Sequence, residues 1–172
     1  METGYGEGMQ FGIEDHEVWK KIDSSAYLFL NKLTEPRDNA LRIVLDEAVA
    51  SPAEAGPKMF PGGINLGEST PIKPTSNCLI FVLNWKSYVA YCVTEEMVGS
   101  CGKYEDEIYT GRLIRSYSKS HFLDFIEKNT GAHFEPYRHY KIACLNHIID
   151  IVSSSEPELQ AISRDETGLM EG

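Results

Sequence analysis

The chain is poor in cysteine, in long apolar runs and in basic segments, and each shortage removes a class of protein. Its four cysteines, at positions 78, 92, 101 and 144, form no Cys-x-x-Cys pair, so we expect neither a disulfide framework nor a zinc site. The most apolar run, residues 78–83, is far shorter than the roughly 20 residues that a membrane-spanning helix needs. Residues 1–8 have no basic region and no apolar stretch, and therefore do not read as a signal peptide.

These absences predict a cytoplasmic protein with reduced thiols. Its composition, 42% hydrophobic and 24% charged, is that of an ordinary globular domain. The net charge of −10 comes mostly from residues 1–23 and 153–172, whereas residues 24–152 are nearly balanced. Acidic ends repel phosphate backbones, so we expect no nucleic-acid partner, and no membrane partner either.

With 172 residues, the chain predicts one domain over residues 15–158. A flexible, Gly-rich acidic tail is expected before it (1–14), and an acidic tail after it (159–172). Residues 51–74 hold five prolines and four glycines and predict a long irregular loop, a feature that is often functional.

Helices are expected over 15–33, in two pieces, and over 120–130, where Ser118 or Ser120 can cap the first turn. The apolar run in the second piece, 26–33, also suits a buried strand, and both interpretations stay open. Four residues give the helix over 120–130 an apolar face: Phe122, Leu123, Phe125 and Ile126.

Alternating apolar residues predict the strands, and two neighbouring ones are expected to pair as a hairpin. Because both faces of this pair are apolar, we expect it to be central in the sheet. Short links between strands favour antiparallel pairing. The fold class is therefore α+β, with a mostly antiparallel or mixed sheet of about five to six strands packed by two helices. The predicted strands are 41–49, the hairpin pair 79–85 and 88–94, then 113–117 and 140–152.

No set of residues predicts catalysis, a cofactor or a metal. Cys144 and His147 are three residues apart on one predicted strand, so their side chains should point to opposite faces. Cys144 is better explained as a core residue. The acidic residues of 95–107 lack the alternating pattern of a calcium loop.

Two groups of residues are candidates for binding. A pocket beneath loop 51–74 could contain Asn84, His147 and Asp150, although a hydrogen-bonded core or edge role is the simpler explanation of His147. The polar segment 95–107, with nearby tyrosines, could contact a protein partner, a basic one by its charge, although a solvated loop is the simpler explanation. The candidate partner-binding residues are Glu95, Glu96, Tyr104, Glu105, Asp106, Glu107 and Tyr109.

Several segments are shared with known proteins: Tyr-Leu-Phe-Leu-Asn at 27–31, Trp-x-Ser-Tyr-Val-Ala-Tyr at 85–91, Tyr-Ser-Lys-Ser-x-Phe-Leu at 117–123 and Cys-Leu-Asn-His-x-x-Asp at 144–150. Over residues 25–158 the chain resembles a family of small bacterial proteins without an assigned activity, so the resemblance implies no site residues. In size and type it is also similar to bacterial immunity proteins, which bind and block toxins.

We therefore expect a non-enzymatic interaction protein, immunity-like in type, that binds a protein partner through exposed aromatic residues and the acidic loop. One alternative is a small enzyme or ligand-binding domain with a pocket near His147. Another is a structural subunit of a homo-oligomer that buries the edge of the predicted hairpin.

Overall fold

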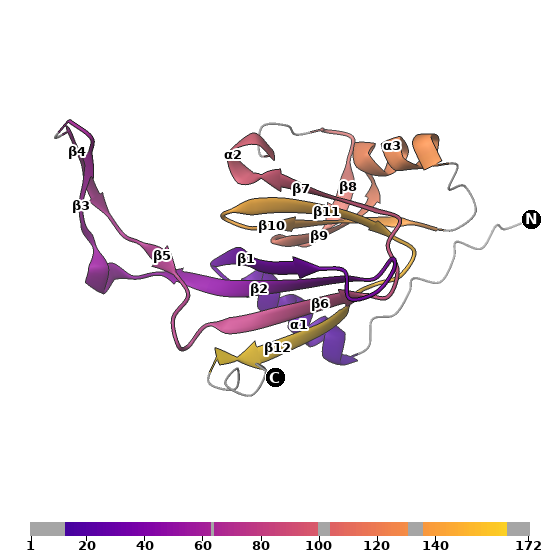
Figure 1. Ribbon diagram of the computed structural model, residues 1–172, viewed down its shortest axis with the longest axis horizontal. Helices are drawn as coiled ribbons and strands as arrows, with labels where there is room; N and C mark the ends of the chain where they lie inside the picture. Colours follow the sequence, from indigo (N-terminus) through magenta and orange to yellow (C-terminus); the bar gives the residue numbers. More distant parts are fainter. Residues whose placement is uncertain (1–12, 63, 100–103, 131–135, 165–172) are drawn as a thin grey trace, which may run out of the picture.

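The computed structural model describes residues 13–62, 64–99, 104–130 and 136–164. Two antiparallel sheets pack face to face, and a separate two-stranded ribbon projects from one end of them (Figure 1). The α+β class and the antiparallel pairing are confirmed. The number of strands is larger than expected, because the described residues form two five-stranded sheets and a ribbon rather than one sheet.

The first sheet has the order β1-β2-β6-β12, and β5 pairs with the end of β2. We call it sheet 1. Its central strand β6 lies between β2 and β12, as the two apolar faces of residues 79–85 predict. The strands are β1 (Tyr27–Thr34), β2 (Leu41–Ala50), β5 (Ile72–Lys73), β6 (Leu79–Trp85) and β12 (Glu158–Ser163).

The second sheet has the order β7-β11-β10-β9-β8, and we call it sheet 2. The helix α3 (His121–Thr130) packs on its outer face, and α1 (Ile13–Ser24) packs against β12 and β9. The strands are β7 (Ala90–Glu95), β8 (Ile108–Thr110), β9 (Ile114–Lys119), β10 (Arg138–Ala143) and β11 (His147–Ser153). A single turn of helix, α2 (Glu96–Gly99), follows β7.

The core lies between the two sheets and is filled by alternate residues of their strands. Sheet 1 contributes Ile43, Leu45 and Phe81, and sheet 2 contributes Ile142 and Ile149, all fully buried. This alternation is the expected pattern of a sheet with one face buried.

Residues 27–34 form the strand β1, so the helical prediction for 26–33 was wrong and the strand alternative was right. The pairing of β1 with β2 shifts between Leu30 and Lys32, which marks a β-bulge. Leu30 and Leu33 therefore both pack on the core, although they are three residues apart. That step of three is what looked like helical spacing in the sequence.

The predicted hairpin of 79–85 with 88–94 was also wrong, because β6 and β7 belong to different sheets. The connection between them crosses from one sheet to the other. Tyr88 donates its N–H to the carbonyl of Asn39, and Val89 donates to Val152 of sheet 2. β7 is consequently an edge strand, with Cys92 and Val93 exposed.

The predicted long strand 140–152 is two strands, β10 and β11, joined by a tight turn. Cys144 donates its N–H to the carbonyl of His147 across this turn. Asn146, in the turn, accepts from the N–H of Leu30 and donates to its carbonyl, each at 2.9 Å. Its amide thus satisfies the edge of β1 as a further strand would.

Loop 51–74 is less irregular than expected. It contains a short 3-10 turn (Pro52–Glu54), the ribbon β3 (Gly56–Phe60) and β4 (Ile64–Ser69), and β5. Gly62 and Gly67 adopt positive φ angles, +98° and +91°, which other residues rarely take. The ribbon extends away from the two sheets (Figure 1).

The predicted C-terminal tail begins too early, because residues 158–163 form β12 and pair with β6. Leu159 is buried in the core. Of the predicted N-terminal tail, residues 1–12 lie outside the described residues, and α1 begins at Ile13.

Candidate functional site

The start of α3 is held from its outer side by the segment that precedes β8. Glu107 accepts a hydrogen bond from the backbone N–H of His121 at 3.0 Å. Asp106 contacts the His121 ring at 2.8 Å and accepts from Lys119 at 3.1 Å. The hydrogen bond from His121, and to a smaller extent that from Lys119, lowers the pKa of Asp106 to about 2. Asp106 is therefore a carboxylate at neutral pH.

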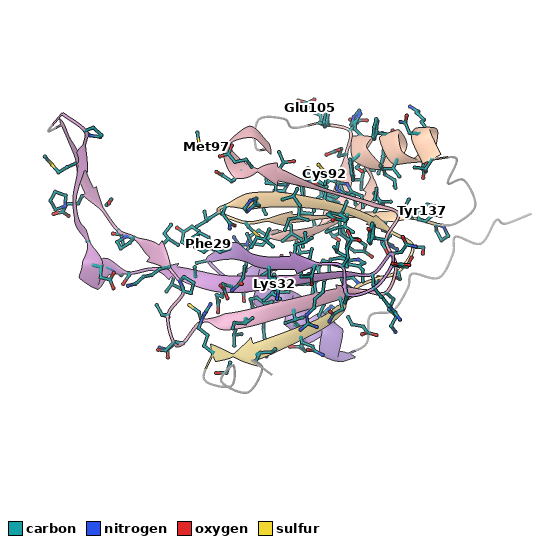
Figure 2. All side chains as sticks on the ribbon, viewed as in Figure 1. Phe29, Lys32, Cys92, Met97, Glu105 and Tyr137 are labelled. Atoms are coloured by element: carbon teal, nitrogen blue, oxygen red, sulfur yellow. The ribbon has the colours of Figure 1, made fainter. Side chains whose placement is uncertain are left out.

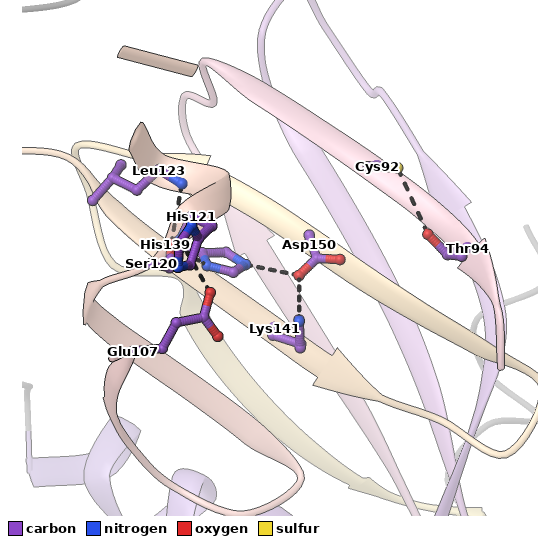
Figure 3. A network of polar contacts seen from close by, with 9 residues as sticks. All are labelled: Cys92, Thr94, Glu107, Ser120, His121, Leu123, His139, Lys141 and Asp150. Carbon is purple, nitrogen blue, oxygen red and sulfur yellow. Dashed lines mark hydrogen bonds and ion pairs between the residues drawn. The ribbon is translucent and has the colours of Figure 1, made fainter. Parts of the chain in front are cut away.

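The same end of α3 is held from its inner side by a buried series of polar groups. Ser120 caps the helix, its Oγ accepting from the N–H of Leu123 at 3.1 Å, so one of the two predicted caps is confirmed. Nδ1 of His139 lies 2.8 Å from Ser120 Oγ, and Nε2 lies 2.8 Å from Oδ1 of Asp150 (Figure 3). Lys141 reaches the same Asp150 oxygen at 3.4 Å.

Serine, histidine and aspartate in series are the components of a hydrolase triad, but their surroundings here are those of a structural network. Ser120 and His139 are each only 1% exposed. Tyr117 stacks on the imidazole with ring centroids 4.5 Å apart, and Phe122 packs at 5.2 Å. The hydroxyl of Ser120 is engaged by both Leu123 and His139. The series thus offers no accessible nucleophile and joins α3 to β10 and β11.

Four large side chains of α3, of β8 and of the segment before β8 remain exposed: Tyr104 (59%), Ile108 (60%), Tyr109 (45%) and Phe125 (57%). The Tyr104 ring packs on the ring of His121, with centroids 4.1 Å apart. His121 and Phe125 are one turn apart and so project from the same side of α3. We call Tyr104, Ile108, Tyr109, His121 and Phe125 the β8–α3 surface.

Tyr109 is fixed on this surface by two neighbours on β9. The guanidinium of Arg115 lies over its ring, 4.7 Å from the centroid, and the ring of Tyr117 lies 4.9 Å away. A cation above an aromatic face is an attractive contact. The exposed ring is therefore held in one position.

The structure brings five of the seven predicted partner-binding residues together next to α3: Tyr104, Glu105, Asp106, Glu107 and Tyr109. Glu95 and Glu96 lie elsewhere, at the end of β7 and the start of α2, where Glu95 pairs with His147. The predicted contact region 95–107 thus occupies two separate places.

The three predicted pocket residues lie in three different surroundings. Asn84, on β6 of sheet 1, accepts from Arg42 at 3.1 Å. His147 and Asp150 are both on β11 but three residues apart, so they face opposite sides of sheet 2. Asp150 takes part in the network with His139. Cys144 is buried, as we expected of a core residue, and its burial raises the pKa of its thiol to about 12.

Sequence reasoning missed three contributors to this region: His139, His121 and Phe125. The pairing of His139 with Ser120 and Asp150 spans three elements, and no local pattern indicates it. Phe125 was assigned to the apolar face of α3, yet only Leu123 and Ile126 of that face are buried. The exposure of Phe125 depends on where the helix sits on the sheet.

Among the described residues, no helix is long and apolar enough to cross a membrane. Within the same part of the chain, no three histidine, cysteine or acidic side chains are grouped as metal ligands would be. Comparison with protein-family models, with curated proteins and with solved structures found no match to this chain.

Proposed function

We propose that the protein is a non-enzymatic interaction protein that binds a partner protein through the β8–α3 surface. The main support is the exposure of Tyr104, Ile108, Tyr109 and Phe125, each by more than two fifths, on α3 and on the segment 104–109 whose Asp106 and Glu107 bond to the start of α3. Where exposed apolar side chains form a patch, they mark interaction sites in soluble proteins. Tyrosine and phenylalanine provide large contact area with few rotatable bonds.

The rigidity of this region also supports binding. Glu107 and Asp106 hold α3 from one side, and Ser120 and His139 hold it from the other. A surface that is already ordered loses little conformational entropy when a partner binds. Contact with the ring of His121 orders even Tyr104, the most exposed aromatic residue of the group.

The charges indicate a partner with a few basic side chains within a mostly apolar contact. Asp106 is already paired with Lys119 and His121, and Glu107 bonds the helix end, so neither carboxylate is wholly available. Glu105 and Asp124 are exposed, and each is next in the chain to an exposed aromatic residue. The net charge of −10 would speed the approach of a basic partner. An immunity protein, which binds and blocks a toxin, is one class that fits this description.

The enzyme alternative has less support. Its best observation is the series Ser120, His139 and Asp150, and burial of the first two withholds the hydroxyl from any substrate. Of the proposed pocket residues, His147 and Asp150 face opposite sides of their sheet. Binding is therefore the function that the geometry favours.

The test is site-specific photo-crosslinking in the source cell, followed by binding of the purified partner. A benzophenone side chain placed at Tyr109 or Phe125 should crosslink one protein that the same group at Met59, exposed on β3, does not. The purified partner should then bind the wild-type chain, and it should bind the double variant Phe125→Ser, Tyr104→Ser at least tenfold more weakly. Phe125 and Met59 have nearly equal exposure, 57% and 58%, so Met59→Ser is the matched control. Identical crosslinks at all three positions, or none at any, would refute the proposal.

A further inference from the structure

β7 is an open sheet edge, and it differs from the other edges of the molecule. The outward groups of β1 are bonded by Asn146 and by Leu145, whose N–H donates to the carbonyl of Leu28. α1 packs along β12, and β8 is only three residues long. β7 has six residues and, in the part of the chain that the structure describes, pairs only with β11.

The residues of β7 carry few of the features that keep a free edge from pairing. Its sequence, Ala-Tyr-Cys-Val-Thr-Glu, has no lysine and no proline, and its single charge is at the last position. Cys92 and Val93 are exposed, Val93 by 41%. Exposed strand edges that lack lysine, proline or a bulge tend to pair with another strand. Figure 1 shows β7 at the border of sheet 2, and Figure 2 marks Cys92 there.

The direction of the free backbone groups follows from the turn before β11. Cys144 donates its N–H to the carbonyl of His147, so the N–H and C=O of His147 point toward β10. These groups alternate in direction along a strand, so Asp150, three residues on, directs its own toward β7. Its partner there is Cys92, which must direct its groups toward β11.

The neighbours of Cys92 consequently direct their groups the other way. The N–H and C=O of Tyr91 and Val93 point outward from the sheet. No described hydrogen bond reaches them. These four groups form a short template for an antiparallel strand.

We propose that a second copy of this chain pairs its β7 with this β7, in antiparallel register about a twofold axis through Cys92. In this register Tyr91 lies opposite Val93 of the second copy, and the outward groups of each bond to the other. Aromatic and β-branched residues form favourable cross-strand pairs. Cys92 lies opposite its own counterpart on the outer face, because directly opposed residues in an antiparallel pair share a face.

Charge compatibility favours a second copy as the occupant. Although each chain carries −10, the segment that would meet its twin, residues 90–94, is uncharged. The two Glu95 residues lie six positions apart along the joined strands, about 20 Å at 3.3 Å per residue. That separation exceeds the Debye length of about 8 Å at physiological salt, so their repulsion is screened. The two edges are also identical and self-complementary, as a twofold interface requires.

The first measurement is the mass of the full chain in solution by light scattering after size-exclusion chromatography. The wild-type chain should have the mass of two chains at micromolar concentration, and Val93→Pro should have the mass of one. Proline removes only an N–H that points outward, so the fold should be retained. Val93→Thr keeps the N–H and should remain dimeric. A single-chain mass for wild type, or a Val93→Pro dimer, would overturn the proposal and leave the edge to a different protein.

A second measurement does not depend on a disruptive variant. In a Cys101→Ser background, a short bismaleimide should join two chains through Cys92, since Cys78 and Cys144 are buried. As a control, Tyr109→Cys in a chain that also lacks Cys92 places a thiol on the other border of sheet 2 and should give no dimer. Joining through position 109 and not through Cys92 would contradict the proposed register.

Discussion

At the scale of the single residue, Gly111 determines how α1 is attached to sheet 2. Its φ of +90° turns the chain so that the following N–H groups face the carboxylate of Asp23. Arg112, Leu113 and Ile114 donate to this carboxylate at distances from 2.9 to 3.3 Å. The Nε of Arg112 also donates to the backbone carbonyl of Asp23 at 2.8 Å. A cluster of consecutive N–H groups is a favourable anion site, and here the anion is a side chain at the end of α1.

Gly111→Ala should destabilise the protein far more than the same change at Gly62. A Cβ at Gly111 would lie 2.0 Å from the carbonyl oxygen of Ile114, whereas at Gly62 it would meet nothing within 4 Å. Both positions have positive φ, so both variants bear the conformational cost of about 1 kcal/mol. The collision should raise the loss at Gly111 to about 3 kcal/mol.

Urea unfolding of the two variants, followed by circular dichroism, measures this difference. Because the φ angles are similar, +90° and +98°, the comparison isolates the collision from the backbone cost. Equal losses of unfolding free energy at the two sites would show that the turn at Gly111 relaxes without cost.

At the scale of the element, the attachment of α3 depends on the hydroxyl of Ser120. Ser120→Ala removes the helix cap, worth about 1 kcal/mol, and leaves the buried Nδ1 of His139 without a partner, which costs about 1 kcal/mol more. We therefore expect a loss of about 2 kcal/mol and faster amide exchange in the first turn of α3. Hydrogen exchange read by mass spectrometry checks both the size and the location of the effect.

Ser118→Ala is the matched control for this prediction. Ser118 is exposed and is the other residue that the sequence offers as a cap, but within the described residues its hydroxyl donates only to the carbonyl of Ile108, at 3.4 Å. Its loss should change stability by less than about 0.5 kcal/mol. If the two serines had equal effects, the buried series through His139 would contribute nothing to α3.

Elements with local signals could be predicted from the sequence, and elements defined by distant contacts could not. α3 has its cap and its apolar positions within one stretch, so its place was found. β6 and β7 are adjacent in the chain and apolar, which is also the signature of a hairpin. They belong to different sheets because β2 and β12 pair with the two edges of β6, and Val89, just before β7, bonds to Val152 of sheet 2. Sequence patterns contain no information of that range.

The candidate surface likewise contains residues that are close in sequence and residues that only distant contacts bring to it. Tyr104, Asp106 and Tyr109 are near one another in the chain, and proximity alone was enough to group them. Phe125 and His139 join the region through the packing of α3 on sheet 2. Asn146 is of a residue type that favours turns, but the apolar residues on both sides of it predict one continuous strand.

At the scale of the whole molecule, an aromatic cluster links α1 to both sheets. Tyr140 of β10 contacts Trp19 of α1 and Trp85 of β6 edge to face, with ring centroids 6.4 and 5.7 Å apart. Its ring is fully buried, and its hydroxyl has no hydrogen-bond partner among the described residues. Burial raises the pKa of this hydroxyl above its ordinary value of 10.0.

Tyr140→Phe should therefore leave the protein as stable at neutral pH, or more stable by about 1 kcal/mol, because it removes a buried, unpaired polar group. A raised folded pKa means that Tyr140 must stay neutral in the folded state but can ionise once unfolded. The contribution of neutral Tyr140 to the free energy of unfolding is therefore fully present below about pH 10 and is lost as the pH rises further. The buried thiol of Cys144 also lowers stability as the pH rises above its ordinary pKa of 9.0. The wild-type protein and Tyr140→Phe both contain this thiol. Above about pH 10 the urea midpoint should therefore fall in the wild-type protein and in Tyr140→Phe, and the fall should be smaller in Tyr140→Phe. Parallel curves, or a clear loss of stability at pH 7, would mean that the hydroxyl has a partner within the folded core.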